Sequence, residues 1–200
     1  MKPKLPRLFS YVVDHDTGYA PNPCCGSCIL SHCKFSKSPP RKNLIESANE
    51  GDWIVGTGGT SPKTVPHGKI VFVMKVEGKL PIGRLFTDEL FALKRGRYDP
   101  PSSGTLHCKH GQWFLVATKE FWYYGRKAID IPDKFRAFKE PDGRVQSLEK
   151  KGPKYKCNFS PQFTQQFISW IKTRKAGCHG KPVMFEEQEI KCSPSKRLCR

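Results

Sequence analysis

The large aromatic side chains are the first candidates for a chemical role, because they occur in a strongly basic sequence. Tyr19, Trp53, Trp113, Trp122 and Tyr124 offer flat surfaces on which nucleic-acid bases stack, each stack being worth about 1–3 kcal/mol. A protein that reads an extruded base needs two such walls and a few fixed hydrogen bonds to the base edge. Packing in a core is the alternative, and it is the favoured one for Trp53 and Trp113 taken individually.

The run from Phe121 to Tyr124 predicts which rings are displayed. Successive side chains of a strand point to opposite faces, so Phe121 and Tyr123 share one face and Trp122 and Tyr124 share the other. If the first pair is buried, the second pair is displayed. We therefore expect Trp122 and Tyr124 to form one wall of a base-binding cleft.

Two loops supply hydrogen-bonding groups for the same cleft. Asn22 lies between two prolines, and a rigid amide is suited to bidentate recognition of an adenine-type edge. The 56–61 loop, Gly-Thr-Gly-Gly-Thr-Ser, lets backbone amides approach a phosphate or a base, although a plain turn between strands explains it equally well. It lacks the Gly-Lys-Ser/Thr ending of a Walker motif. The expected base site consists of Tyr19, Asn22, Trp53, Gly56, Thr57, Gly58, Trp122 and Tyr124.

The nine cysteines predict thiols without a metal or a disulfide framework. Cys25, Cys28 and Cys33, with His32, have the density of a zinc site, but a complete site needs a second pair, and Cys178–His179 is distant in the chain. We therefore predict no bound metal and no cofactor. An odd number of cysteines also argues against a fully paired set of disulfides.

A base-modifying enzyme is the alternative to a binding protein. Cys28 or Cys33 would be its nucleophile, or Asp14 its acid–base group, although an Asp in such a loop more often makes turn hydrogen bonds. The zinc deaminase signature is excluded, because His-x-Glu occurs nowhere in the sequence. No complete catalytic signature is present, which favours binding over catalysis.

The charge of the chain points to nucleic acid as the partner. There are 35 Lys and Arg against 18 Asp and Glu, a formal net charge of +17, and such a field attracts phosphate backbones. We expect phosphate contacts from the basic loop that contains Lys34, Lys37, Arg41 and Lys42. An interaction protein that is merely tethered by a basic tail is a further alternative.

Membrane association is not expected. No stretch approaches the roughly 18 apolar residues of a membrane span, and no basic amphipathic helix favours a membrane surface. The sequence starts without a signal-peptide pattern, so we expect an intracellular protein. The oligomeric state is left open by the sequence.

Short β-rich segments must position these residues. We expect an α+β fold, built on a small, curved, mostly antiparallel sheet or barrel with short helices and a C-terminal docking helix. The helical segments are residues 44–49, residues 88–94 capped by Thr87, and a helix from Pro161 with Phe163, Phe167, Trp170 and Ile171 on one face. The strands are expected over residues 8–13, 53–57, 69–76, 112–117 and 121–124.

The chain divides into four predicted parts. Residues 1–136 form the domain, and 137–156 form a polar, basic connector that we expect to be a long loop or semi-ordered. Residues 157–177 contain the helix that packs on the domain, and 178–200 form a basic, cysteine-containing tail that we expect to be frayed or disordered.

Several motifs resemble a known family. Arg7–Val13, Gly18–Pro23, Gly51–Gly58 and Phe121–Gly125 are similar to the second type of nucleotide modification associated domain, over about residues 7 to 136. The resemblance implies a link to DNA modification without naming a reaction, so we expect DNA as the nucleic acid. The order of elements is also similar to that of PUA-like domains such as EVE and YTH, which implies that a modified base enters an aromatic pocket.

Overall fold

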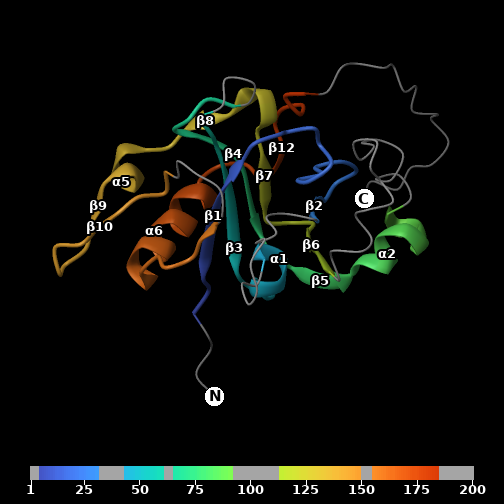
Figure 1. Cartoon of the computed structure of the whole chain (residues 1–200), viewed down its shortest axis with the longest axis horizontal. Helices are drawn as coiled ribbons and strands as arrows, with labels where there is room; N and C mark the ends of the chain where they lie inside the picture. The colour runs from blue at the N-terminus through green and yellow to red at the C-terminus, as the bar shows by residue number, and fades with distance from the viewer. Residues whose placement is uncertain (1–4, 32–42, 61–64, 92–112, 150–154, 185–200) are drawn as a thin grey trace.

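The computed structural model describes residues 5–31, 43–60, 65–91, 113–149 and 155–184. A seven-stranded central sheet organises them (Figure 1). Its main path runs β11-β1-β3-β4-β7-β12, and β8 also pairs with β4. The strands are β1 (Leu8–Val13), β3 (Trp53–Gly58), β4 (Lys69–Lys75), β7 (Phe121–Tyr123), β8 (Ile129–Asp130), β11 (Tyr155–Lys156) and β12 (Gly177–Cys178).

The central sheet is mixed and open. β1 runs parallel to β3, and β12 runs parallel to β7, whereas the remaining pairs are antiparallel. The two ends of the path, β11 and β12, do not pair with each other, so the described strands form no closed barrel. Of the two shapes expected from the sequence, the sheet is the one observed.

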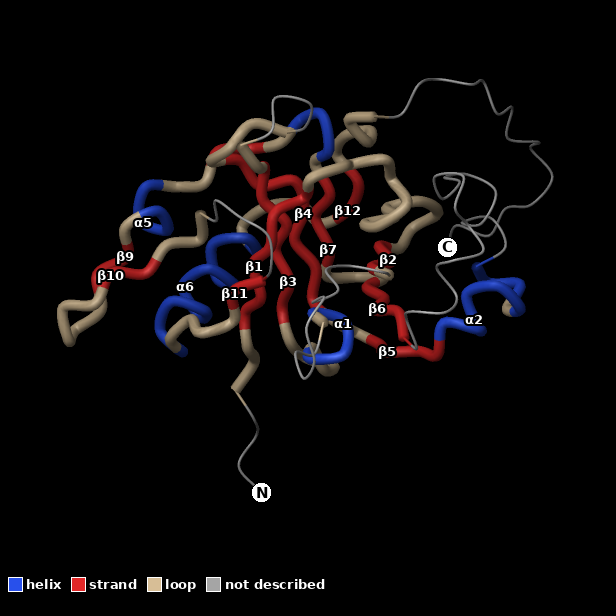
Figure 2. The backbone as a smooth tube through the Cα atoms, viewed as in Figure 1, coloured by secondary structure: helices blue, strands red, loops and turns tan. Residues whose placement is uncertain are grey.

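Smaller elements lie on both sides of this sheet (Figure 2). A three-stranded sheet of order β2-β6-β5 and a hairpin β9-β10 accompany it. Their strands are β2 (Cys28–Leu30), β5 (Gly78–Pro81), β6 (Trp113–Ala117), β9 (Phe138–Lys139) and β10 (Val145–Gln146). The helices are α1 (Leu44–Ser47), α2 (Ile82–Thr87), α5 (Asp133–Arg136) and α6 (Pro161–Lys172), with 3-10 turns η1 (Glu89–Phe91) and η2 (Gly125–Lys127).

Helix α6 begins at Pro161, as the sequence predicts. The Ser160 hydroxyl accepts a hydrogen bond from the Phe163 N–H, and Pro161 occupies the first turn, where a missing N–H costs nothing. Phe163, Phe167 and Ile171 then fall on one face and are fully buried. The helix therefore docks on the central sheet through this apolar stripe.

Both faces of the central sheet are buried. One face carries a core that includes Phe9, Phe72 and Tyr123 and is covered by α1 and the small sheet. The other face carries a second core in which Trp53 and Trp122 pack with residues of α5 and α6. The molecule is thus layered, with the central sheet between two covers.

Two segments have more structure than the sequence predicts. Residues 137–156, expected to be an irregular connector, contain the β9-β10 hairpin and β11, which pairs with β1. Residues 178–184, expected to be frayed, contain the end of β12 and hydrogen bonds from Val183 and Met184 to Asp16. Both expectations were wrong for these residues, because strands of two residues show no periodicity that a sequence reading can detect.

The expectation of a helix over residues 88–94 is wrong for residues 88–91, and residues 92–94 lie outside the described residues. Helix α2 ends at Thr87, Asp88 is its C-cap, and η1 follows. The Thr87 hydroxyl donates to the Gly83 carbonyl within α2 and so does not cap a following helix. None of the helices in the described residues is long and apolar enough to cross a membrane.

Candidate nucleic-acid interface

The two loops expected to form the base site do leave the same end of the sheet. β1 and β3 are parallel and in register from Leu8–Trp53 to Val13–Gly58, so the 14–27 loop and the turn after Gly58 start side by side. A Cβ on Gly59 would lie 2.6 Å from the Val12 side chain and 3.7 Å from the Asp14 carboxylate. The two segments expected as strands over residues 8–13 and 53–57 are therefore neighbours in the central sheet.

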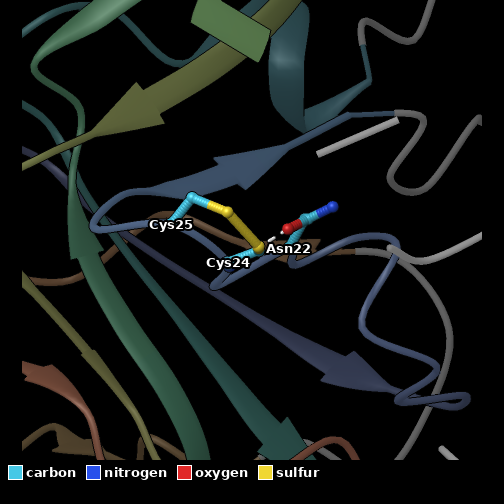
Figure 3. The surroundings of a disulfide bond; sticks show 3 residues. All are labelled: Asn22, Cys24 and Cys25. Carbon is cyan, nitrogen blue, oxygen red and sulfur yellow. Dashed lines mark hydrogen bonds between the residues drawn. A yellow bond between two sulfur atoms is a disulfide. The ribbon is translucent and has the colours of Figure 1, made fainter. Parts of the chain in front are cut away.

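The predicted recognition groups in these loops are used within the fold. Asn22 is buried, its backbone pairs with Ile29, and its side-chain oxygen accepts the Cys24 N–H at 3.1 Å (Figure 3). Thr57 is fully buried, and its hydroxyl donates to the Tyr11 carbonyl at 3.4 Å. Tyr19 is half-buried. The loop amide is thus held rigid, as expected, but it faces its own chain.

The glycines of β3 serve packing in this structure. A Cβ on Gly56 would collide with the Phe72 ring, and one on Gly58 would collide with the backbone of Val65 and Pro66. Both positions need a residue without a side chain because neighbouring strands approach so closely. The structure provides this packing reason for them independently of any ligand.

Two of the cysteines are paired. Cys24 and Cys25 form a disulfide between adjacent residues (Figure 3), which corrects the expectation of a thiol at these positions. It closes no loop between distant segments, so it is not a framework. Cys28 is fully buried and is not part of this disulfide, and Cys33 lies outside the described residues.

The described residues contain no group of three or more His, Cys, Asp or Glu placed to hold a metal. His32 and Cys33, which belong to the zinc-like spacing, lie outside the description. The absence of a metal or cofactor therefore stays a prediction.

The expected aromatic wall is buried. Trp53 and Trp122 are 2% exposed and Tyr124 is 6% exposed. The two indoles stack with ring centroids 5.9 Å apart, and Trp122 Nε1 donates to the Arg174 carbonyl at 2.9 Å. The inference that Trp122 and Tyr124 are displayed was wrong, because alternation separates two faces of a strand but does not reveal that α6 covers the second one.

The buried rings and the Asn22 loop therefore do not meet in one cleft. Trp122 and Tyr124 belong to the core beneath α6, whereas Ala20, in the same loop as Asn22, packs against the core on the opposite face. The residues proposed as phosphate contacts, Lys34, Lys37, Arg41 and Lys42, lie outside the described residues.

An accessible aromatic surface occurs instead on α6. Trp170 is half-buried, and its ring packs edge-on against Phe135, centroids 5.6 Å apart. The Arg174 guanidinium lies over the same indole, 4.8 Å from the ring centroid. A guanidinium plane on an indole is a surface on which a further flat group can stack.

A groove adjoins this indole. It has a volume of about 510 Å³ and is lined by Trp170, Lys134 and four polar residues of α6, namely Gln165, Gln166, Ser169 and Thr173. Volumes of this size are typical of sites that hold small ligands or single groups. Amide and hydroxyl side chains supply both donors and acceptors to whatever occupies it.

The cations around Trp170 form no ion pair with a carboxylate of the described residues. Within the described ranges, Lys134, Arg174 and Lys175 take part in no ion pair, whereas Lys69, Lys75, Arg84 and Arg136 each do. The exposed end of α6 thus combines an aromatic ring, polar side chains and unbalanced positive charge. We refer to Lys134, Gln165, Gln166, Ser169, Trp170, Thr173 and Arg174 as the α6 surface.

Sequence reasoning placed Trp170 on the buried stripe of α6. The ring lies at the edge of that stripe, next to Phe167 and Ile171, which are fully buried. The basic residues that follow it, Lys172, Arg174 and Lys175, are the signal that would have indicated an exposed edge.

Most of the positive charge lies outside the described residues. The described ranges hold 17 of the 35 Lys and Arg and 14 of the 18 Asp and Glu, so their formal charge is close to neutral. Local placement of charge, as on the α6 surface, is therefore more informative than the total.

The carboxyl group of Asp16, in the loop after β1, is fully buried. It accepts hydrogen bonds from the Tyr123 hydroxyl at 2.6 Å and from the Val183 N–H at 3.1 Å. Burial raises the pKa of Asp16 above its usual value, and these hydrogen bonds act in the opposite direction. The group ties the first loop to β7 and to residues 183–184.

Comparison with known protein families agrees with the resemblance that the sequence motifs indicate. A family model described as nucleotide modification associated domain 2 matches residues 5–111. The chain therefore belongs to the family of nucleotide modification associated domain 2, which links it to nucleotide or DNA modification. No curated protein and no solved structure matches the chain.

Proposed function

We propose that this chain is a nucleic-acid-binding protein that acts in DNA base modification and that it contacts the nucleic acid through the α6 surface. The observation that carries the proposal is the stack of Arg174 on the half-buried Trp170, beside a polar groove and without an ion pair to any carboxylate of the described residues. A base can extend this stack on the outer face of the guanidinium, and Lys134 and Lys175 lie in reach of flanking phosphates.

The finer part of the proposal concerns the base. We propose that the protein recognises a modified or flipped base in a PUA-like manner, with the groove beside Trp170 receiving it. The groove polar groups, Gln165, Gln166 and Ser169, offer the few directed hydrogen bonds that reading a base edge requires. Support comes from the family's link to modification and from the order of elements β1, α1, β3 and β4.

The enzymatic alternative receives less support. The Cys28 thiol is fully buried in the core, so substrate cannot reach it in this structure. Asp14 is exposed, and the described residues hold no group of three or more His, Cys, Asp or Glu placed to bind a catalytic metal beside it.

Salt-dependent binding tests the proposal. Fluorescence anisotropy with a labelled single strand and a duplex should show affinity that falls steeply with salt. The double variant Lys134→Gln, Lys175→Gln should reduce the slope of log affinity against log salt by about 1–2, because each lost phosphate contact releases about one counterion fewer. Lys127→Gln, an exposed cation on η2, is the matched control and should leave the slope unchanged.

The base preference is tested with the same assay. Oligonucleotides that differ in one modified base should bind with different affinities, and the difference should shrink in the Gln166→Ala variant. Equal affinity for every base would contradict base recognition while leaving nucleic-acid binding intact. No binding at low salt would contradict the proposal as a whole.

A further inference from the structure

A second groove lies on the other side of α6, at the end of the central sheet where β3 begins and β4 ends. It has a volume of about 360 Å³, within the range of ligand pockets. Its apolar walls come from Leu5, Pro6, Trp53 and Ile168, and its charged groups include Lys75 and Lys172. It shares no lining residue with the groove beside Trp170.

Two ammonium groups in this groove share one carboxylate. Lys75 Nζ lies 2.5 Å from one oxygen of Glu120, and Lys172 Nζ lies 2.7 Å from the other. Burial acts to raise the pKa of Glu120, but hydrogen bonds from both lysines lower it below its usual value. The trio thus carries one unbalanced positive charge on two amines held close together.

The amines are oriented by their surroundings. Lys172 Nζ lies over the Trp53 ring, 5.6 Å from its centroid, and the same ring stacks on Trp122. The turn that carries Glu120 is fixed by Glu77, which accepts the backbone N–H groups of residues 118, 119 and 120. A site with fixed charges spends less free energy on ordering when a ligand arrives.

Two further acidic residues border the groove without competing for these lysines. The Asp52 carboxylate is bonded to Arg7 at 2.6 Å and to the Asn49 N–H at 2.9 Å. Glu50 is exposed. Neither forms an ion pair with Lys75 or Lys172 in the described part of the chain.

We propose that this groove binds an organic phosphate monoester with a flat, largely apolar body, of the class of the nucleoside 5′-monophosphates. The phosphate would accept hydrogen bonds from the remaining N–H groups of Lys75 and Lys172, beside Glu120, and the body would pack on Leu5, Pro6 and Ile168. Two amines that outnumber their carboxylate suit an oxyanion, and the apolar wall suits a ring more than it suits inorganic phosphate. The inference does not depend on the α6 surface.

Calorimetry with wild-type protein at low salt tests the inference, with dTMP, thymidine and inorganic phosphate as probes. dTMP should bind at least about tenfold more tightly than either of the others, because only dTMP uses both halves of the groove. Binding of inorganic phosphate as tight as that of dTMP would reduce the site to an unspecific anion site and overturn the proposal.

Substitutions of the two groove lysines test whether dTMP binds in this groove. Lys75→Gln and Lys172→Gln should each weaken dTMP at least about tenfold, the effect of losing one charge-assisted hydrogen bond. Lys69→Gln is the matched control, because Lys69 lies on the same strand and is also ion-paired, to Asp130 at 2.9 Å, but lies outside the groove. Affinity of Lys69→Gln should stay within about twofold of wild type.

One variant, Glu120→Gln, is expected to gain affinity for dTMP, and this distinguishes an effect on binding from an effect on folding. Glu120→Gln removes the carboxylate that competes for both amines, so it should tighten dTMP binding, which a misfolded protein would not do. In wild type, dTMP should also protect Lys172 but not Lys69 from acetylation measured by mass spectrometry. Unchanged or weakened binding in Glu120→Gln, together with no protection of Lys172, would overturn the proposal.

Discussion

The hydroxyl of Tyr123 on β7 donates a 2.6 Å hydrogen bond to the buried carboxylate of Asp16 in the loop after β1. This bond joins two segments 107 residues apart: Asp16 lies within the part of the chain that matches the family model, and Tyr123 lies beyond it. Val183 N–H binds the other oxygen of the same carboxylate, so the loop, β7 and the end of the described chain meet at Asp16. The contact stabilises the end of the central sheet from which the 14–27 loop and the turn after Gly58 leave.

Removal of the Tyr123 hydroxyl should therefore destabilise the fold. Tyr123→Phe leaves a buried carboxylate without its closest donor and should lower the free energy of unfolding by about 1–3 kcal/mol. Tyr155→Phe is the control, since its hydroxyl bonds Ser47 in a partly buried position and should cost less. Urea unfolding of both variants measures the difference, and equal costs would contradict the role assigned to Asp16.

The position of residues 179–184, which follow β12, depends on Gly180. A Cβ on Gly180 would collide with the carbonyl oxygen of Tyr124, so Gly180→Ala should displace this segment. The amides of His179, Val183 and Met184, which bond Tyr123 and Asp16, should then exchange hydrogen faster. Gly83→Ala, where a Cβ meets nothing within 4 Å, should leave their exchange unchanged.

Trp122 should behave as a core residue. Trp122→Ala removes a buried indole that stacks on Trp53 and should cost about 3–5 kcal/mol of unfolding free energy. Thermal and urea unfolding measure this cost. A variant of nearly wild-type stability would instead show that the ring is displayed, as alternation alone suggested.

Glu77 should make stability depend on pH. Burial acts to raise its pKa, but hydrogen bonds from the Thr118 hydroxyl and from the N–H groups of Thr118, Glu120 and Lys119 bring it below the usual value. Because folding favours the carboxylate, its stabilisation is complete above the unfolded pKa of about 4.3 and is lost as pH falls through the lowered folded pKa.

The variant Glu77→Gln isolates this effect. Its stability deficit against wild type in urea unfolding should be largest above about pH 5 and should shrink toward pH 3. Glu89→Gln, an exposed residue of η1, is the control. A deficit that grows as the pH falls would have the wrong sign for a lowered pKa.

The regular elements with strong local signals could be predicted from the sequence. Runs of β-branched and aromatic residues predicted β1, β3 and β4, and a Ser-Pro start with an apolar stripe predicted α6. The two-residue strands β8 to β12 could not be predicted, because their pairing depends on partners far away in the chain.

The candidate site could be predicted only in part. The common exit of the Asn22 and Gly58 loops followed from strand order, and family membership followed from motifs. The burial of Trp122 and the exposure of Trp170 could not be predicted, because both depend on where α6 lies across the sheet. A hydrophobic pattern identifies the face of an element but not the layer that covers it.

Binding of a labelled single strand to Trp170→Ala, compared with Trp113→Ala, tests the central claim most directly. Trp113 is the matched control, because it is also half-buried and has a cation, Lys79, over its ring, but it lies on β6 in the small sheet. Loss of stacking on Trp170 should cost about 1–3 kcal/mol, a weakening of roughly 5- to 150-fold, with Trp113→Ala near wild type and both variants folded by circular dichroism. Equal affinity of Trp170→Ala and wild type would contradict nucleic-acid binding at the α6 surface.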